Sequence, residues 1–216
     1  MLTREQFLPH EMRIVAALRM QGANDEQVIV RVKSENLFQY PTERMVANRA
    51  TVCLRRLDAM VPTDAACAAR GIDPNTAVEA ALSLTGLMAS GTPTQADQAI
   101  FYSMICRYDI VRELVLVEVG ERLQNFDYAF TAVDLNAFMT RFTTEYPDAA
   151  RWTEATVKRI KGSLRQTLRH AGLIGEGMGP ESERLSPLFL DSDVERALVQ
   201  LGEQSLIAAL TGRVVM

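Results

Sequence analysis

Hydrophobic residues recur every three or four positions along most of the chain, which is the spacing of amphipathic helices. The first segments with this spacing cover residues 10–21, 25–35 and 43–60. Gly22 ends the first of them, while Asn24 and Thr42 are residue types that cap the start of a helix. We therefore expect residues 1–62 to form an N-terminal unit of three helices.

The third of these segments, TERMVANRATVCLRRLDAM, is sharply two-faced. At ~100° per residue, its apolar stripe consists of Val46, Ala50, Cys53 and Leu57. Its polar stripe consists of Arg44, Asn48, Thr51 and Arg55. Three short helices in series resemble a helix-turn-helix unit whose third helix reads DNA. The same pattern fits a three-helix bundle with a solvated outer face, and both interpretations stay open.

The middle of the chain, residues 63–123, has the pattern of packing helices. An alanine-rich connection, TDAACAARGIDP, comes first. Asp73 followed by Pro74 suits a helix start, with a cap and then the first helical position. The spacing then predicts helices over residues 74–90, 94–108 and 109–123. The valine-rich stretch LVLVEV in the last segment also fits a strand, but the charged residues within and before it favour a helix.

The last third, residues 124–216, begins and ends with helical patterns. Its periodic segments cover residues 132–146, 154–170, 191–201 and 203–210. Thr131 or Asp134 is placed to cap the first segment, and Thr153 the second.

A strand-like pattern follows the second of these helices. Residues 173–174, a glycine-rich tip and residues 184–190 predict two short strands joined by a loop. Helix, helix and β-ribbon is the order of elements in a winged helix. The whole pattern therefore predicts a mainly α protein, a helical bundle with helix-turn-helix elements and a C-terminal winged-helix-like unit.

The composition is that of a packed soluble protein, with 48% hydrophobic and 23% charged residues. A net charge of −4 and a pI near 5.3 argue against a protein that coats nucleic acid over its whole surface, but they allow a local basic patch.

Cys53, Cys67 and Cys106 are far apart and odd in number, which is typical of free thiols in a reducing cytoplasm. The start, MLTREQFLPHEMR, lacks the apolar core of a signal peptide. The most apolar window, residues 99–119, contains five charged residues, so we expect a cytoplasmic protein without a membrane span.

One short segment is strongly basic in this acidic chain. Between residues 151 and 170 the cations are Arg151, Lys158, Arg159, Lys161, Arg165 and Arg169. Only Glu154 opposes them, so six positive charges and one negative charge give +5. On a helical wheel the apolar residues of this segment share one stripe, and most of the cations form a ridge beside it that we expect to face solvent.

Such a ridge suits docking on double-stranded DNA, whose axis carries one phosphate charge per ~1.7 Å. We predict phosphate contacts by Lys158, Arg159, Lys161, Arg165 and Arg169. Arg151 and Arg184 would flank them, and Gln166 or Ser163 would reach base edges. Arg44, Asn48 and Arg55 would form a second, weaker DNA site. The other interpretation is that these cations only solvate a surface helix and offset nearby acidic residues.

Residue patterns that support catalysis are missing from the sequence. Its two histidines, His10 and His170, lie far apart, and it contains no HExxH, CxxC, P-loop or GxSxG motif. The stretch GEGMGP follows a helical pattern instead of a strand, so we interpret it as a loop tip. We expect no enzymatic activity, no cofactor, no metal and no small-molecule substrate.

Three stretches match the pattern of a known family. They are VKSENLFQYPTERMVANRATVCLRRL (32–57), YDIVRELVLVEVGERL (108–123) and ATVKRIKGSLRQTLRHAGLI (155–174). In order and spacing they resemble the BrxA family, a small component of BREX bacteriophage-exclusion systems, over nearly the whole chain. The resemblance implies an all-helical cytoplasmic protein that binds double-stranded DNA and acts beside a methyltransferase, an ATPase and other proteins of the system. It implies no enzymatic activity.

These observations lead to alternative functional hypotheses. The first is a non-enzymatic DNA-binding subunit of a phage-defence system. The second is an adaptor whose basic helix docks an acidic partner protein without direct DNA binding. RNA binding is a weaker third hypothesis, because only 6% of the residues are aromatic and they are not arranged as stacking platforms.

Overall fold

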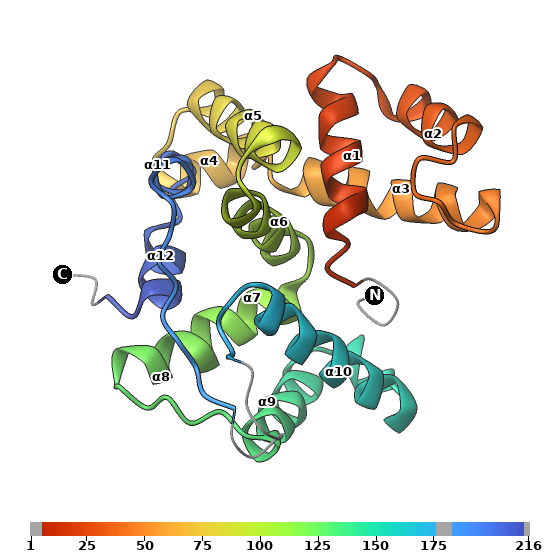
Figure 1. Cartoon of the computed structure of the whole chain (residues 1–216). Helices are drawn as coiled ribbons and strands as arrows, with labels where there is room; N and C mark the ends of the chain where they lie inside the picture. The colour runs from red at the N-terminus through yellow and green to blue at the C-terminus, as the bar shows by residue number, and fades with distance from the viewer. Residues whose placement is uncertain (1–5, 176–182, 214–216) are drawn as a thin grey trace. The chain divides into compact units, whose positions relative to one another are not determined.

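The computed structural model describes residues 6–175 and 183–213, and most of them are helical, which confirms the mainly α class (Figure 1). The contacts divide the chain into two compact units. The N-terminal unit consists of Leu8–Arg107 and the returning segment Leu190–Glu203. The C-terminal unit consists of Tyr108–Phe189, Gln204–Met216 and the first residues up to Phe7. The division by contacts thus falls at residue 107, whereas the segments suggested by the sequence meet at residues 62 and 123.

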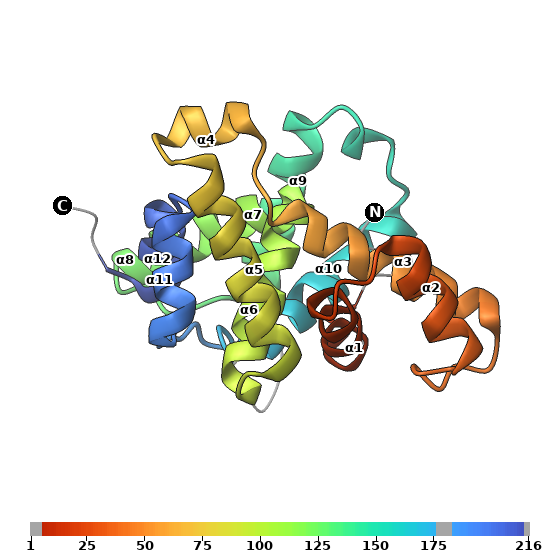
Figure 2. The same ribbon diagram turned by 90° about the horizontal axis from the view of Figure 1, so that it is seen from above.

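The N-terminal unit packs its helices around an apolar core. These helices are α1 (Pro9–Met20), α2 (Asp25–Ser34), α3 (Glu43–Ala59), α4 (Asp64–Arg70), α5 (Pro74–Ser90), α6 (Pro93–Arg107) and α11 (Ser192–Gln200). Helix α1 packs on α5 and α3, and α11 returns from late in the sequence to pack on α5 (Figure 2). Met12, Val15, Leu84 and Met88 are fully buried in this core.

The predicted helix starts of this unit are confirmed by their caps. Asn24 Oδ1 accepts a hydrogen bond from the Gln27 amide at 2.9 Å, and Gln27 Oε1 accepts one from the Asn24 amide. Thr42 caps α3 and Asp73 caps α5 through their side-chain oxygens. These contacts satisfy amide groups that the first turn of a helix leaves without a backbone partner.

Helix α4 corrects the sequence prediction of a plain connection before Asp73. Thr63 accepts a hydrogen bond from the Ala66 amide at its start, and Gly71 ends it in the left-handed conformation with φ 66°. The alanines in between have high helix propensity, which explains why this seven-residue segment is helical.

The C-terminal unit contains a helical rod, which we define as the three consecutive helical stretches from Asp109 to Gln124. Its elements are α7 (Asp109–Glu113), the π-helical stretch η2 (Leu114–Val119), α8 (Gly120–Gln124), α9 (Ala132–Glu145), the 3₁₀ turn η3 (Ala149–Arg151), α10 (Glu154–His170) and α12 (Gln204–Thr211). The stretch LVLVEV is thus helical, as the charged residues indicated, although its turns are wider than those of an α-helix. Helix α12 packs on η2 and α8.

The apolar window at residues 99–119 does not form one continuous helix. Tyr108 has an extended backbone, with φ −126° and ψ 108°, and separates α6 from α7. Within the described part of the chain, no helix is both long and apolar enough to cross a membrane.

Candidate nucleic-acid interface

Helix α10 places the basic segment on the C-terminal unit. Thr153 caps it by accepting a hydrogen bond from the Thr156 amide at 3.2 Å, as predicted. Ile160, Leu164 and Leu168 are buried, which confirms the apolar stripe of the helical wheel. This burial fixes the rotation of the helix and therefore decides where its cations point.

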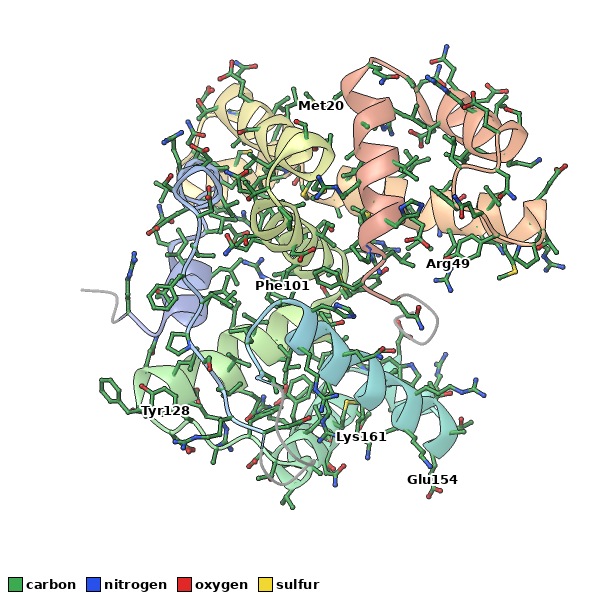
Figure 3. The ribbon with its side chains drawn as sticks, in the orientation of Figure 1. Met20, Arg49, Phe101, Tyr128, Glu154 and Lys161 are labelled. Atoms are coloured by element: carbon green, nitrogen blue, oxygen red, sulfur yellow. The ribbon has the colours of Figure 1, made fainter. Side chains whose placement is uncertain are left out.

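The first half of α10 presents uncompensated positive charge. Lys158 and Arg159 are exposed, and within the described residues neither has an ion-pair partner. Lys161 is half-buried, and its ammonium donates a hydrogen bond to Asn136 Oδ1 of α9 at 2.7 Å. An amide cannot neutralise this cation, so its charge remains. Figure 3 labels Glu154 at the helix start and Lys161 about two turns further along.

The second half of α10 differs from the expectation of a ridge facing solvent. Arg165 Nε lies 2.8 Å from Glu183 Oε2, and Arg169 Nη2 contacts Glu183 Oε1. The Glu183 side chain is fully buried. These two arginines are therefore not free cations, and their contact with phosphate stays a prediction.

The chain segments around α10 pair through isolated backbone contacts. In the described residues the bridges are Ile174–Leu185 and Ala129–Arg184, both antiparallel. The Leu185 amide donates to the Tyr128 carbonyl at 2.8 Å. The predicted two-stranded ribbon is not confirmed as a sheet, and most of its glycine-rich tip, residues 176–182, lies outside the described residues. The pairing with Ala129 was not anticipated, because that residue lies in a short link before α9.

The flanking and secondary cations are exposed. Arg151 ends η3 and Arg184 follows the buried Glu183, and neither has an ion-pair partner among the described residues. Arg44, Asn48 and Arg55 lie on the exposed face of α3, opposite its buried stripe, as predicted. They belong to the N-terminal unit, whereas the α10 set belongs to the C-terminal unit.

Several contacts of the basic helix were not visible in the sequence pattern. Glu183 and Asn136 come from segments outside α10, and their polarity alone gave no sign of which cation they meet. His170 stacks on Phe7 with ring centroids 5.1 Å apart, so its imidazole packs at the end of α10. The signal available in the sequence was the position of Glu183 two residues before Leu185, since strand residues two apart share one face. A carboxylate on an inward face requires a partner.

The N-terminal unit contains an open cleft of about 410 Å³ between α1, α3 and α5. Met20, Val61 and Leu82 line it, and their exposed fractions are 50%, 43% and 54%. Arg19 lies on its rim and pairs with Asp25 and with Asp58, the latter at 3.3 Å. Burial and the nearby Asp25 raise the pKa of the Asp58 carboxyl, while Arg19 opposes this shift. Arg19 therefore pairs with two carboxylates, of which Asp58 also lines the cleft.

Metal-ligand chemistry finds no support in the described residues. In residues 6–175 and 183–213, no group of three or more His, Cys, Asp or Glu side chains is arranged to hold a metal ion.

The fold and this surface define a class: a mainly helical protein of two compact units, one of which carries a cationic surface helix. Residues 1–202 match the sequence profile of the BrxA family, so the chain belongs to that family. A relative from Escherichia coli O9:H4 (strain HS), described as BREX protein BrxA, is 21% identical over 127 residues. That match covers 59% of this chain and spans 58% of the relative's length.

A solved structure has a similar fold. It is the crystal structure of an uncharacterized protein from Magnetospirillum magneticum, with a TM-score of 0.74 and 16% sequence identity. The match covers 98% of this chain and 96% of that protein.

Proposed function

We propose that this protein is a non-enzymatic, double-stranded DNA-binding component of a BREX phage-defence system, with α10 as the element that contacts the duplex. Membership of the BrxA family supports the assignment to BREX and to partners among the other proteins of that system. The observation that carries DNA binding is the pair Lys158 and Arg159, exposed and without ion-pair partners in the described residues on the first half of α10. Phosphates would supply the missing negative charge.

The order of elements around α10 supports a winged-helix-like arrangement. Helix α9 is followed by α10, then by residue 174, which bridges to residue 185, while residue 184 bridges back to residue 129 ahead of α9. In helix-turn-helix proteins the second helix lies in the major groove and its N-terminal residues approach the bases. We place the first half of α10 in that position, where its exposed cations meet phosphate.

The remaining predicted contacts are assigned by exposure and charge. Arg151, Lys161 and Arg184 add positive charge to the pair on α10. Gln166 is exposed and Ser163 is half-buried, and their polar groups are candidates for base edges. The α3 residues Arg44, Asn48 and Arg55 are proposed as the second, weaker site.

Paired substitutions test this assignment. Lys158→Gln with Arg159→Gln should weaken binding to a short random-sequence duplex and should reduce the log–log salt slope by about 1.8, which is 0.9 for each phosphate that is no longer neutralised. A charge-matched control is Arg31→Gln with Arg196→Gln. These arginines are exposed and have nearby acidic partners, Glu35 and Asp193, so affinity and slope should remain close to wild type. Equal binding by the two double variants would contradict the proposal.

A second candidate function, a protein–protein adaptor, is favoured by the cleft of the N-terminal unit. Its exposed apolar side chains, together with the two carboxylates that contact Arg19, fit a partner that presents an apolar side chain beside a lysine or arginine. Such a cation would pair with the carboxylate that Arg19 leaves undercompensated between Asp25 and Asp58.

Interaction with the other proteins of the system tests the adaptor function. Leu82→Asp places a charge in the cleft at a side chain that is 54% exposed, and it should abolish co-purification with one of them. Val199→Asp, at a side chain 48% exposed on α11, is the matched control. If every protein that binds the wild type also binds Leu82→Asp, the cleft is not the docking site.

A further inference from the structure

Glu183 lies at an inward-facing position of the segment that follows the glycine-rich tip. Glu183 and Leu185 are buried, with exposed fractions of 2% and 3%, while Arg184 between them is exposed. This alternation is that of an extended strand with one face on the core. An inward position of such a strand is usually apolar, so a carboxylate there needs a specific role.

The two oxygens of Glu183 contact two arginines of α10. Oε2 lies 2.8 Å from Arg165 Nε, and Oε1 contacts Arg169 Nη2. The arginines are four residues apart, so they lie on the same side of the helix about one turn apart. One carboxylate therefore joins the segment after the tip to two successive turns of α10.

The two arginines differ in how much of each side chain remains exposed to solvent. The Arg165 side chain is 22% exposed, and its Nε and Nη2 atoms are buried. Neither these atoms nor Glu183 Oε2 has a hydrogen-bond partner among the described residues, so the 2.8 Å contact is an ion pair without hydrogen-bond geometry. The Arg169 side chain is 43% exposed. The buried nitrogens of Arg165 cannot reach a phosphate without breaking this contact, and Arg169 would have to withdraw the Nη2 that faces Glu183. Either change would leave the buried carboxylate with one partner fewer.

We infer that Glu183 is a latch that fixes residues 183–185 on α10, and that Arg165 and Arg169 are positioning residues instead of phosphate contacts. The part of this inference that concerns DNA rests on the proposed function. It confines phosphate binding on α10 to the first half of the helix, where Lys158 and Arg159 are exposed. Arg165 and Arg169, which the sequence predicts as phosphate contacts, thus fix the position of residues 183–185 on α10.

The latch itself is tested by unfolding, independently of DNA. Glu183→Gln, Arg165→Gln and Arg169→Gln should each lower the denaturant midpoint. Each double variant that combines Glu183→Gln with one arginine substitution should lose clearly less stability than the sum of its two single changes, because the second change removes a group already left unpaired.

The control for these unfolding measurements is Glu121→Gln. Glu121 is exposed on α8 and has no ion-pair partner among the described residues, so the midpoint should not change. Additive losses would overturn the latch.

The positioning role is tested by the salt dependence of binding to a random-sequence duplex. Arg165→Gln and Arg169→Gln should leave the log–log slope at the wild-type value, whereas Lys158→Gln should reduce it by about 0.9. A reduction of about 0.9 for either arginine variant would show a phosphate contact and overturn the positioning role. If the wild type shows no salt-dependent duplex binding, the proposed function fails, and the unfolding measurements alone decide whether the latch exists.

Discussion

At the scale of single residues, Glu203 is a buried charge in the N-terminal unit. It is 3% exposed, accepts a hydrogen bond from the Tyr102 hydroxyl at 3.3 Å and lies 3.0 Å from Arg70 Nη1. Glu203→Gln removes the charge but keeps the shape, so we expect a loss of about 3 kcal/mol in the free energy of unfolding. Chemical denaturation measures it, with the exposed Glu79→Gln on α5 as a control that should change little. A loss no larger than that of the control would contradict this role.

Cys53 supports a prediction about thiol reactivity. Burial raises the pKa of its thiol to about 12, although Arg56 opposes the shift. Because the thiolate is the reactive form, Cys53 should resist alkylation in the native protein at neutral pH. Cys106 is only partly buried and should react first. Peptide mapping after timed labelling measures both rates, and equal rates for the two cysteines would contradict the prediction.

The residues of the candidate site were predicted only in part. The amphipathic pattern correctly separated the buried stripe of α10 from its cations, because burial follows helical spacing. It did not predict that Arg165 and Arg169 share the buried carboxylate of Glu183, since Glu183 belongs to a separate segment and no periodicity connects them. Arg56 shows the same limit. It is 0% exposed, although an arginine on a surface helix is usually solvated.

At the scale of secondary-structure elements, the caps and the helical spacing predicted most helices well, because both signals are local. Thr131, one of the two residues expected at this cap, begins α9, and Thr153 begins α10 as expected. Asp191, expected as the first residue of a helix, is instead the side-chain cap of α11. The π-helical turns of η2 and the isolated bridges around α10 depend on packing between distant segments. Local spacing therefore did not predict them.

Gly120 tests the packing of the rod in the C-terminal unit. A Cβ added there would lie 2.8 Å from the Cβ of Ala209 on α12, so Gly120→Ala should destabilise the protein by about 1–3 kcal/mol. Combining it with Ala209→Gly should restore part of the loss by removing the clashing methyl group. Gly162→Ala on α10 is the control. Apart from the backbone of its own helix, no described residue lies within 4 Å of its added Cβ, so it should stabilise the helix by up to about 1 kcal/mol. A neutral Gly120→Ala would contradict the tight packing.

The start of α9 should be sensitive to acid. Burial raises the pKa of Asp134, but hydrogen bonds from Thr131 and the charge of Arg122 outweigh it and lower the pKa below 3.8. A carboxyl with a lowered folded-state pKa stabilises the protein above its unfolded-state pKa, and this contribution is lost as the pH falls through the folded-state value. The difference in unfolding temperature between wild type and Asp134→Asn should therefore shrink below about pH 4. A difference that stays constant from pH 6 to pH 2 would contradict this assignment.

At the scale of the whole molecule, the distribution of charge matters more than its total. The chain carries a net charge of −4, yet exposed cations without partners among the described residues gather on and beside α10. An acidic remainder disfavours non-specific attachment elsewhere on the surface. The local basic surface is thus the feature that the proposed DNA binding depends on.

The most direct test of DNA binding is a salt titration of wild-type protein with random-sequence duplex DNA. Among the described residues on and beside α10, the cations without an ion-pair partner are Arg151, Lys158, Arg159, Lys161 and Arg184. Neutralising about five phosphates predicts a log–log slope of roughly −4 to −5. Absence of binding at low salt, or an affinity that does not change with salt, would contradict the proposed binding of double-stranded DNA.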